Sequence, residues 1–177
     1  IGEFGEERRS VVTIKQVPKA LVDAILAAED ERYFQHKGVD YLGVARAAIA
    51  NFTFIGPRQG ASTITMQVAR NFFLTREKTI TRKVNEMLLA FKIESSLTKE
   101  QILELYINQI YLGQRAYGFA SAARIYYGKP LEGLSLAEIA MLAGLPKGPS
   151  IFNPVANPAR AKLRQQYVLD RKSTRLN

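Results

Sequence analysis

The stretch PKALVDAILAAED, residues 18–30, decides the fold class of this chain. Its larger apolar side chains recur at intervals of three and four positions, which is the spacing of one face of an α-helix. Pro18 suits a first helical position, so the pattern predicts a helix that ends near Asp30. Segments with the same spacing follow along most of the sequence. We therefore expect a mainly α-helical protein.

An acidic residue lies on the apolar face of this first helix. Glu29 follows Ile25 by four positions and Val22 by seven, so its carboxylate shares their face. Partial burial raises the pKa of such a carboxyl group and makes a glutamate useful as a proton acceptor or donor near neutral pH. A helix cap or an ion-pair partner is the commoner role of a core-facing glutamate. Spacing alone does not decide between these roles.

Capping residues and glycines place the remaining helix ends. The expected starts are at Asp40, Ser62, Thr79 or Thr81, Thr98 with Gln101, Ser135 with Glu138, and Asn157 before Pro158. The expected ends are at Phe54, Asn71, Gly113, Gly128 and Asp170. Residues 55–60 break the helical pattern between two of these segments.

Two later helices carry groups of polar residues. Arg82 and Lys83 precede Glu86 by four and three positions, so all three can share one helix face, typical of a surface ion pair worth well under about 1 kcal/mol. On the shorter helix before them, a polar stripe could bind sugar hydroxyls or phosphate oxygens, although a solvated face is the simpler interpretation. The stripe consists of Thr63, Gln67, Arg70 and Asn71. His36 taken alone is typical of a structural histidine.

Composition limits the classes of protein. The 177 residues, 47% of them apolar, are enough for one substantial core. A formal net charge of +9 favours an anionic partner, such as nucleic acid, anionic lipid or pyrophosphate. The lack of cysteine and the single histidine exclude a disulfide framework and metal sites built from the usual soft ligands. The longest apolar runs are too short to span a membrane.

Five short motifs follow one another in order along the chain. They read EDERYFQHKG at 29–38, GASTITMQ at 60–67, RKVNE at 82–86, ILELYINQIYLG at 102–113, and AGLPKGPS at 143–150 with NP at 153–154. Together they resemble the signatures of the peptidoglycan glycosyltransferases found in class A penicillin-binding proteins and as monofunctional transglycosylases. The resemblance covers about residues 17–170. Two positions depart from the commoner pattern, Met66 in place of Gln and Arg70 in place of Lys.

The resemblance implies a lysozyme-like helical domain, in which a larger lobe and a smaller membrane-facing jaw surround an extended cleft. It implies that residues 11–171 form the glycosyltransferase domain. Residues 1–10 are expected to be an N-terminal linker or an artificial remnant, and residues 172–177 a non-native tail, because the sequence there leaves the helical pattern.

The reaction implied is polymerisation of lipid II into β-1,4-linked glycan strands, with inversion and release of undecaprenyl pyrophosphate. By motif position, Glu29 is the general base and Glu86 the second carboxylate. The implied substrate-binding residues are Ser62, Thr63, Gln67, Arg70, Asn71, Arg82, Lys83, Lys147 and Ser150. The implied supporting residues are Asp30, Phe34, His36, Gly60 and Asn108. No cofactor is required and no metal site is visible, although a divalent cation, Mg²⁺ or Mn²⁺, is compatible with the chemistry near Glu86.

The expected partners are lipid II, the growing glycan strand and the membrane surface, which residues 52–55 and 72–74 could enter. The parent protein is expected to work at the outer face of the cytoplasmic membrane, with an N-terminal anchor and a fused transpeptidase domain. A lysozyme-like muramidase or lytic transglycosylase is the nearest alternative. A basic nucleic-acid-binding module and an inactive membrane adaptor are others. We expect no nucleic-acid partner, because the basic residues are scattered among acids and no binding motif occurs.

Overall fold

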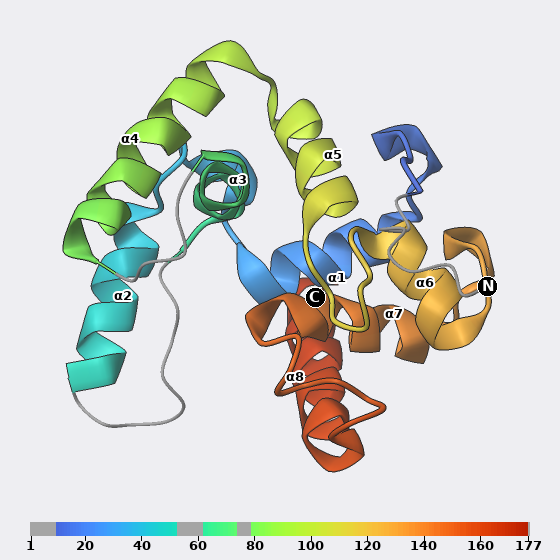
Figure 1. The fold of residues 1–177 in the computed structure, drawn as a ribbon. Helices are drawn as coiled ribbons and strands as arrows, with labels where there is room; N and C mark the ends of the chain where they lie inside the picture. Colours follow the sequence, from blue (N-terminus) through green and yellow to red (C-terminus); the bar gives the residue numbers. More distant parts are fainter. Residues whose placement is uncertain (1–9, 53–61, 74–78, 177) are drawn as a thin grey trace. The chain divides into compact units, whose positions relative to one another are not determined.

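The computed structural model describes residues 10–52, 62–73 and 79–176 (Figure 1). The α-helices are α1 (Lys19–Glu29), α2 (Tyr41–Phe52), α3 (Ile64–Phe73), α4 (Ile80–Ser96), α5 (Lys99–Gln109), α6 (Phe119–Tyr127), α7 (Leu136–Gly144) and α8 (Pro158–Leu176). Short 3-10 turns are η1 (Ile14–Gln16), η2 (Tyr33–Gln35), η3 (Leu131–Gly133) and η4 (Leu145–Lys147). Apart from one isolated bridge between Tyr111 and Tyr117, the described residues form no β-structure. The mainly α fold is confirmed.

The chain divides into two compact units. The first unit comprises Ile1–Glu31 and Glu104–Asn177, and the second unit comprises Arg32–Leu103. The boundaries fall just after α1 and within α5. The implied lobes and cleft stay predictions.

In the first unit, α1, α7 and α8 pack against one another (Figure 1). Leu21 and Ile25 of α1 are fully buried, as are Leu142 of α7 and Val168 of α8. The apolar face that the first helix shows in the sequence is therefore core. Each such side chain contributes about 1.5–3 kcal/mol of transfer free energy when it is buried.

In the second unit, α3 packs against α4 around a small core. Val39, Met66 and Ala90 are buried together, and Met87 and Phe91 pack against them. Met66, which departs from the commoner residue of its motif, thus fills core space. An unbranched side chain is well suited to an irregular gap of this kind.

Several predicted caps are present. Asp40 Oδ1 accepts a hydrogen bond from the Gly43 amide at 3.0 Å, at the start of α2. Thr79 Oγ1 accepts one from the Arg82 amide, which selects Thr79 over Thr81 as the start of α4. The expected capping boxes and the left-handed glycine that ends α6 are also confirmed: Thr98 with Gln101, Ser135 with Glu138, and Gly128.

Three predicted boundaries are wrong. Thr63 rather than Ser62 caps α3, because Thr63 Oγ1 accepts a hydrogen bond from the Met66 amide at 3.1 Å. Gly113 does not end a helix; it lies in the turn beyond α5 with φ of +85°. The last helix passes Asp170 and continues to Leu176, into the stretch that we expected to be a tail. The expected end of α2 at Phe54 lies outside the described residues.

Candidate active site

The first carboxylate centre is built on the last residue of α1. The side chain of Glu29 is only 8% exposed, as its place on the apolar face predicts. Its Oε1 accepts a hydrogen bond of 3.3 Å from Arg164 Nη2 of α8. Glu29 is thus a buried acid with a cationic partner, so the ion-pair interpretation of this residue is correct. That role does not exclude proton transfer.

The charge of Glu29 lies where a helix tolerates it least. The partial negative charge of a helix dipole gathers at the C-terminal end, so an anion there needs a cation nearby. α8 supplies two of them. Arg164 pairs with Glu29, and Arg171 donates to the carbonyl of Ala27 at 3.3 Å and pairs with Glu31 at 3.4 Å. The end of α1 is therefore held by arginines from one face of α8.

Arg164 was missed in the sequence analysis. It is separated from Glu29 by 135 positions, and no periodicity reports a contact between two helices so far apart. The available signal was local: Arg164, Tyr167 and Arg171 recur at intervals of three and four, a basic and aromatic face on the last helix. That face contacts the end of α1.

The second carboxylate centre lies in the first turns of α4. The side chain of Glu86 is 1% exposed. Lys83 Nζ donates to Glu86 Oε2 at 2.9 Å and to Ser62 Oγ at 2.7 Å, while Arg82 Nε lies 3.5 Å from Glu86 Oε1. The expectation of a surface ion pair is therefore wrong, because the carboxylate is buried between two cations that reach the protein surface.

The charges of this second centre do not cancel. One carboxylate faces two cations, and the side chains of Arg82 and Lys83 are 19% and 41% exposed. Arg82 Nε and Glu86 Oε1 are buried without a hydrogen-bond partner among the described residues. Such a centre keeps a net positive charge that can face an anion. Ser62 belongs to it through Lys83.

The polar stripe of α3 is not a solvated face. Thr63 and Gln67 are buried, Arg70 is half-buried, and only Asn71 is exposed. The Thr63 hydroxyl also donates to the carbonyl of Gly38, in addition to capping α3. Thr63 therefore orders its own segment, and its direct contact with substrate stays a prediction, as do those of the other three residues.

The remaining predicted residues lie at various depths. Asp30 and His36 are buried, Phe34 is exposed, and Lys147 and Ser150 are exposed around η4. Asn108 is a structural anchor, because its Oδ1 accepts from the Val12 amide at 2.9 Å and its Nδ2 donates to the Val12 carbonyl at 2.8 Å. Gly60 lies outside the described residues.

Neither a metal-ligand cluster nor a membrane-spanning helix occurs in the described part of the chain. No group of three or more His, Cys, Asp or Glu side chains there is arranged to hold a metal ion. None of the helices found there has the length and apolarity to cross a bilayer.

Each of the two units thus buries one glutamate beside cationic side chains, Glu29 with Arg164 and Glu86 with Lys83 and Arg82. The sequence model of the family described as Transglycosylase matches residues 1–173. The chain therefore belongs to the transglycosylase family of peptidoglycan glycosyltransferases.

Comparisons with individual proteins agree with this family assignment. Penicillin-binding protein 1A of Neisseria cinerea is 62% identical over 170 residues, which cover 96% of this chain and 21% of that protein. A putative transglycosylase of Cupriavidus necator is 62% identical over 160 residues, or 90% of this chain and 69% of that protein. The crystal structure of penicillin-binding protein 1A from Haemophilus influenzae matches with a TM-score of 0.57 and 33% identity, over 97% of this chain and 16% of that one. The chain thus spans about a fifth of the first of these relatives.

Proposed function

We propose that this chain polymerises lipid II into β-1,4-linked glycan strands and releases undecaprenyl pyrophosphate with inversion at the anomeric carbon. The observation that carries the proposal is the buried Glu86 held between Lys83 and Arg82, because this centre offers positive charge to a pyrophosphate. Membership of the transglycosylase family supports the same reaction.

The proton and the leaving group are assigned to different centres. The 4-hydroxyl oxygen of the incoming lipid II attacks the anomeric carbon of the growing strand. The bond from that carbon to the pyrophosphate oxygen breaks, and the pyrophosphate leaves with the electron pair. Glu29 takes the hydroxyl proton, and Lys83 and Arg82 stabilise the departing charge. Glu86 orients these two cations through its ion pairs.

The other predicted ligands keep their places in this proposal. Arg70, Asn71, Gln67, Thr63 and Ser62 bind the donor sugar and its phosphates, and Lys147 and Ser150 bind near Glu29. Arg70 brings a planar fork that can hold two oxygens at once. The reaction requires no cofactor, and a divalent cation is compatible with the pyrophosphate step.

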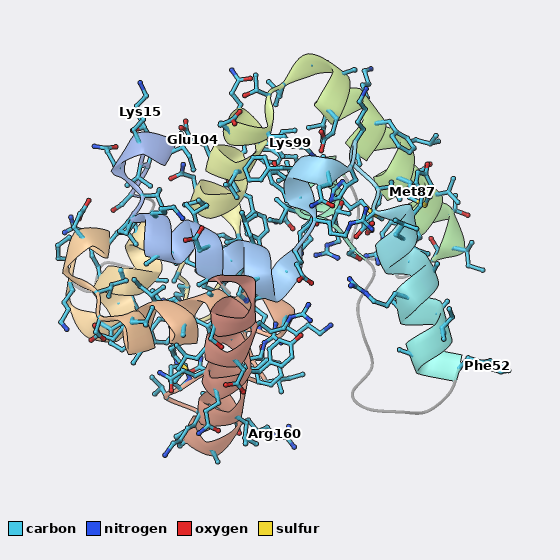
Figure 2. The ribbon with its side chains drawn as sticks, turned by 180° about the vertical axis from the view of Figure 1, so that it is seen from behind. Lys15, Phe52, Met87, Lys99, Glu104 and Arg160 are labelled. Carbon is cyan, nitrogen blue, oxygen red and sulfur yellow. The ribbon has the colours of Figure 1, made fainter. Side chains whose placement is uncertain are left out.

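The second unit also supports a membrane contact. Large apolar side chains are exposed along α2 and along α4: Tyr41, Leu42, Ile49 and Phe52 on α2, and Ile80, Val84 and Leu88 on α4. Phe52 is 86% exposed at the C-terminal end of α2 (Figure 2). Large apolar side chains that are exposed together on a protein surface are typical of an interaction site. We propose that the exposed side chains of α2 and α4 enter the membrane surface that holds the lipid-linked substrate, together with Phe72, which is also exposed.

We place the reaction at the outer face of the cytoplasmic membrane. The relatives named penicillin-binding protein 1A are about five times longer than the matched region, which supports a parent protein with further domains, a transpeptidase among them. An N-terminal anchor outside this chain would hold such a protein at the membrane.

The direct test is incubation of the chain with lipid II, with vesicles present, and separation of the products by size. We expect polymer and released undecaprenyl pyrophosphate. Finished glycan, offered in a parallel reaction, should remain intact. Cleavage of glycan without consumption of lipid II would instead support the lysozyme-like alternative and refute the proposal.

A further inference from the structure

Arg164 contacts Glu29 and is itself fixed by three other groups. Its Nη2 donates to Glu29 Oε1 at 3.3 Å, and its Nε donates to the carbonyl of Gly144 at 3.3 Å. The guanidinium carbon lies 4.6 Å from the ring centroid of Tyr167 and 5.9 Å from that of Phe152. The side chain is only 11% exposed. Contacts from several sides thus hold the guanidinium in one place beside the carboxylate.

The residue at position 144 makes room for this arginine. A Cβ atom on Gly144 would lie 2.8 Å from Arg164 Cγ, which is closer than packed atoms allow. The backbone there has φ of −79° and ψ of −21°, an ordinary helical conformation that needs no glycine. The lack of a side chain at position 144 is therefore explained by the passage of the Arg164 side chain.

We infer that Arg164 is a positioning residue, which fixes the Glu29 carboxylate in the orientation that accepts the proton of the attacking hydroxyl. This inference rests on the function proposed above. A glutamate side chain has several rotatable bonds, and a base that samples many rotamers is seldom within reach of its proton. A guanidinium clamped by a carbonyl and a ring restricts that sampling before substrate binds.

The contact between Arg164 and Glu29 also affects the charge state of the carboxylate. An adjacent cation favours the ionised carboxylate, so Glu29 is kept ready to accept a proton. Charged groups at this end of α1 include Arg164 and Arg171 from α8 and the neighbouring Asp30 and Glu31, while α7 contributes the Gly144 carbonyl. Loss of Arg164 removes the cation that pairs with Glu29, while Asp30, Glu31 and Arg171 remain. The acid limb of the pH–rate profile should then move to higher pH.

Lysine separates orientation from charge. Arg164→Lys keeps the positive charge but loses the planar fork that binds both Glu29 and Gly144. We expect Arg164→Ala to lower kcat for lipid II polymerisation by about a hundredfold, the effect typical of a misplaced catalytic group. KM should change little. Arg164→Lys should recover part of kcat and leave the acid limb in place.

Gly144→Ala supplies a second variant that leaves the arginine in the sequence. The added methyl group should push Arg164 away from Glu29 and lower kcat in the same way. In the Arg164→Ala background the clash is absent, so Gly144→Ala should cause no further loss. Arg160→Ala is the matched control, because Arg160 is an exposed arginine one turn earlier on α8 (Figure 2). It should retain normal activity.

Thermal unfolding of each variant separates a loss of fold from a loss of positioning. A folded Arg164→Ala variant with normal kcat would overturn the inference. So would a double variant, Arg164→Ala with Glu29→Gln, in which the two losses of kcat multiply in full. Should Arg164→Ala fail to fold, normal kcat in Gly144→Ala together with normal kcat in Arg164→Lys would overturn it. Failure of the unaltered chain to polymerise lipid II would instead refute the proposed function itself.

Discussion

Lys83 donates a hydrogen bond of 2.9 Å to the buried carboxylate of Glu86, and both side chains project from the first turns of α4. A lysine three positions before a glutamate is a common surface pair on a helix. Here the carboxylate of Glu86 is buried, while the ammonium group of Lys83 remains partly exposed. The pair therefore presents a fixed cation at the surface, with its counter-charge below it.

Replacement of Lys83 should remove charge stabilisation from the leaving pyrophosphate. We expect Lys83→Met to lower kcat by about a hundredfold or more, as when one preorganised electrostatic donor is removed from an active site. Initial rates of lipid II polymerisation measure this. Lys92→Met is the control, because Lys92 is exposed farther along the same helix. Equal rates for the two variants would contradict the assigned role of Lys83.

Replacement of Glu86 should act on stability as well as on activity. Glu86→Gln keeps the shape of the side chain but leaves Arg82 and Lys83 facing each other without an anion. Breaking a buried ion pair from one side costs about 3–5 kcal/mol, although the partial exposure of both cations should reduce this cost. Chemical denaturation measures the loss. An unchanged free energy of unfolding would show that the buried charge is not needed.

Glu29→Gln tests the base directly. The amide keeps the size of the side chain but cannot take the hydroxyl proton, so we expect kcat to fall by at least about a hundredfold. Glu31→Gln is the control, because Glu31 lies two positions later and its pair with Arg171 is exposed. A surface pair contributes at most about 1 kcal/mol, so this control should fold and remain active. Activity of Glu29→Gln close to normal would refute the role of Glu29.

The sequence predicted the helices and the burial of Glu29 because both follow from periodicity. Residues three and four positions apart share a helix face wherever the helix packs. The same reasoning failed for Glu86, which was expected on a surface, because the depth of a helix face depends on what covers it. The interpretation of Thr63 and Gln67 as part of a solvated face failed for the same reason. Arg164 was missed since its contact with Glu29 exists only after α8 has packed against α1.

The apolar surface of the second unit predicts membrane binding that has two components. Substitution of Ile49 and Phe52 by serine removes exposed apolar area, so we expect a clear loss of binding to vesicles. Binding to anionic vesicles should also weaken as salt rises, because the formal net charge is +9.

Co-sedimentation with neutral and anionic vesicles measures both components. Val155→Ser is the control, since Val155 is an exposed apolar residue of the first unit. Equal losses in the control and in the double variant would contradict a membrane contact localised on α2.

Tyr126 predicts how the first unit responds to alkaline pH. Burial is the largest cause that raises the pKa of Tyr126 to about 12, followed by the neighbouring Tyr111 and Tyr127. Burial likewise raises the pKa of Tyr127. The Tyr126 hydroxyl donates to the Leu112 carbonyl at 2.8 Å and lies 3.4 Å from Asn153 Nδ2, so it holds the turn after α5 near the segment after η4.

The sign of the effect follows from proton binding. A tyrosine whose folded pKa lies above its unfolded value of about 10 keeps its proton longer in the folded state. Its contribution to stability is complete below pH of about 10 and is lost as pH rises towards about 12. The free energy of unfolding should therefore decline across this range. At pH values below this range, Tyr126→Phe should lower stability by about 1 kcal/mol, through loss of one hydrogen bond. Within the range, the variant should show a flatter decline. Denaturation at a series of pH values measures both effects, with the exposed Tyr41→Phe as control. A decline of equal steepness in Tyr126→Phe would assign the alkaline transition to other groups.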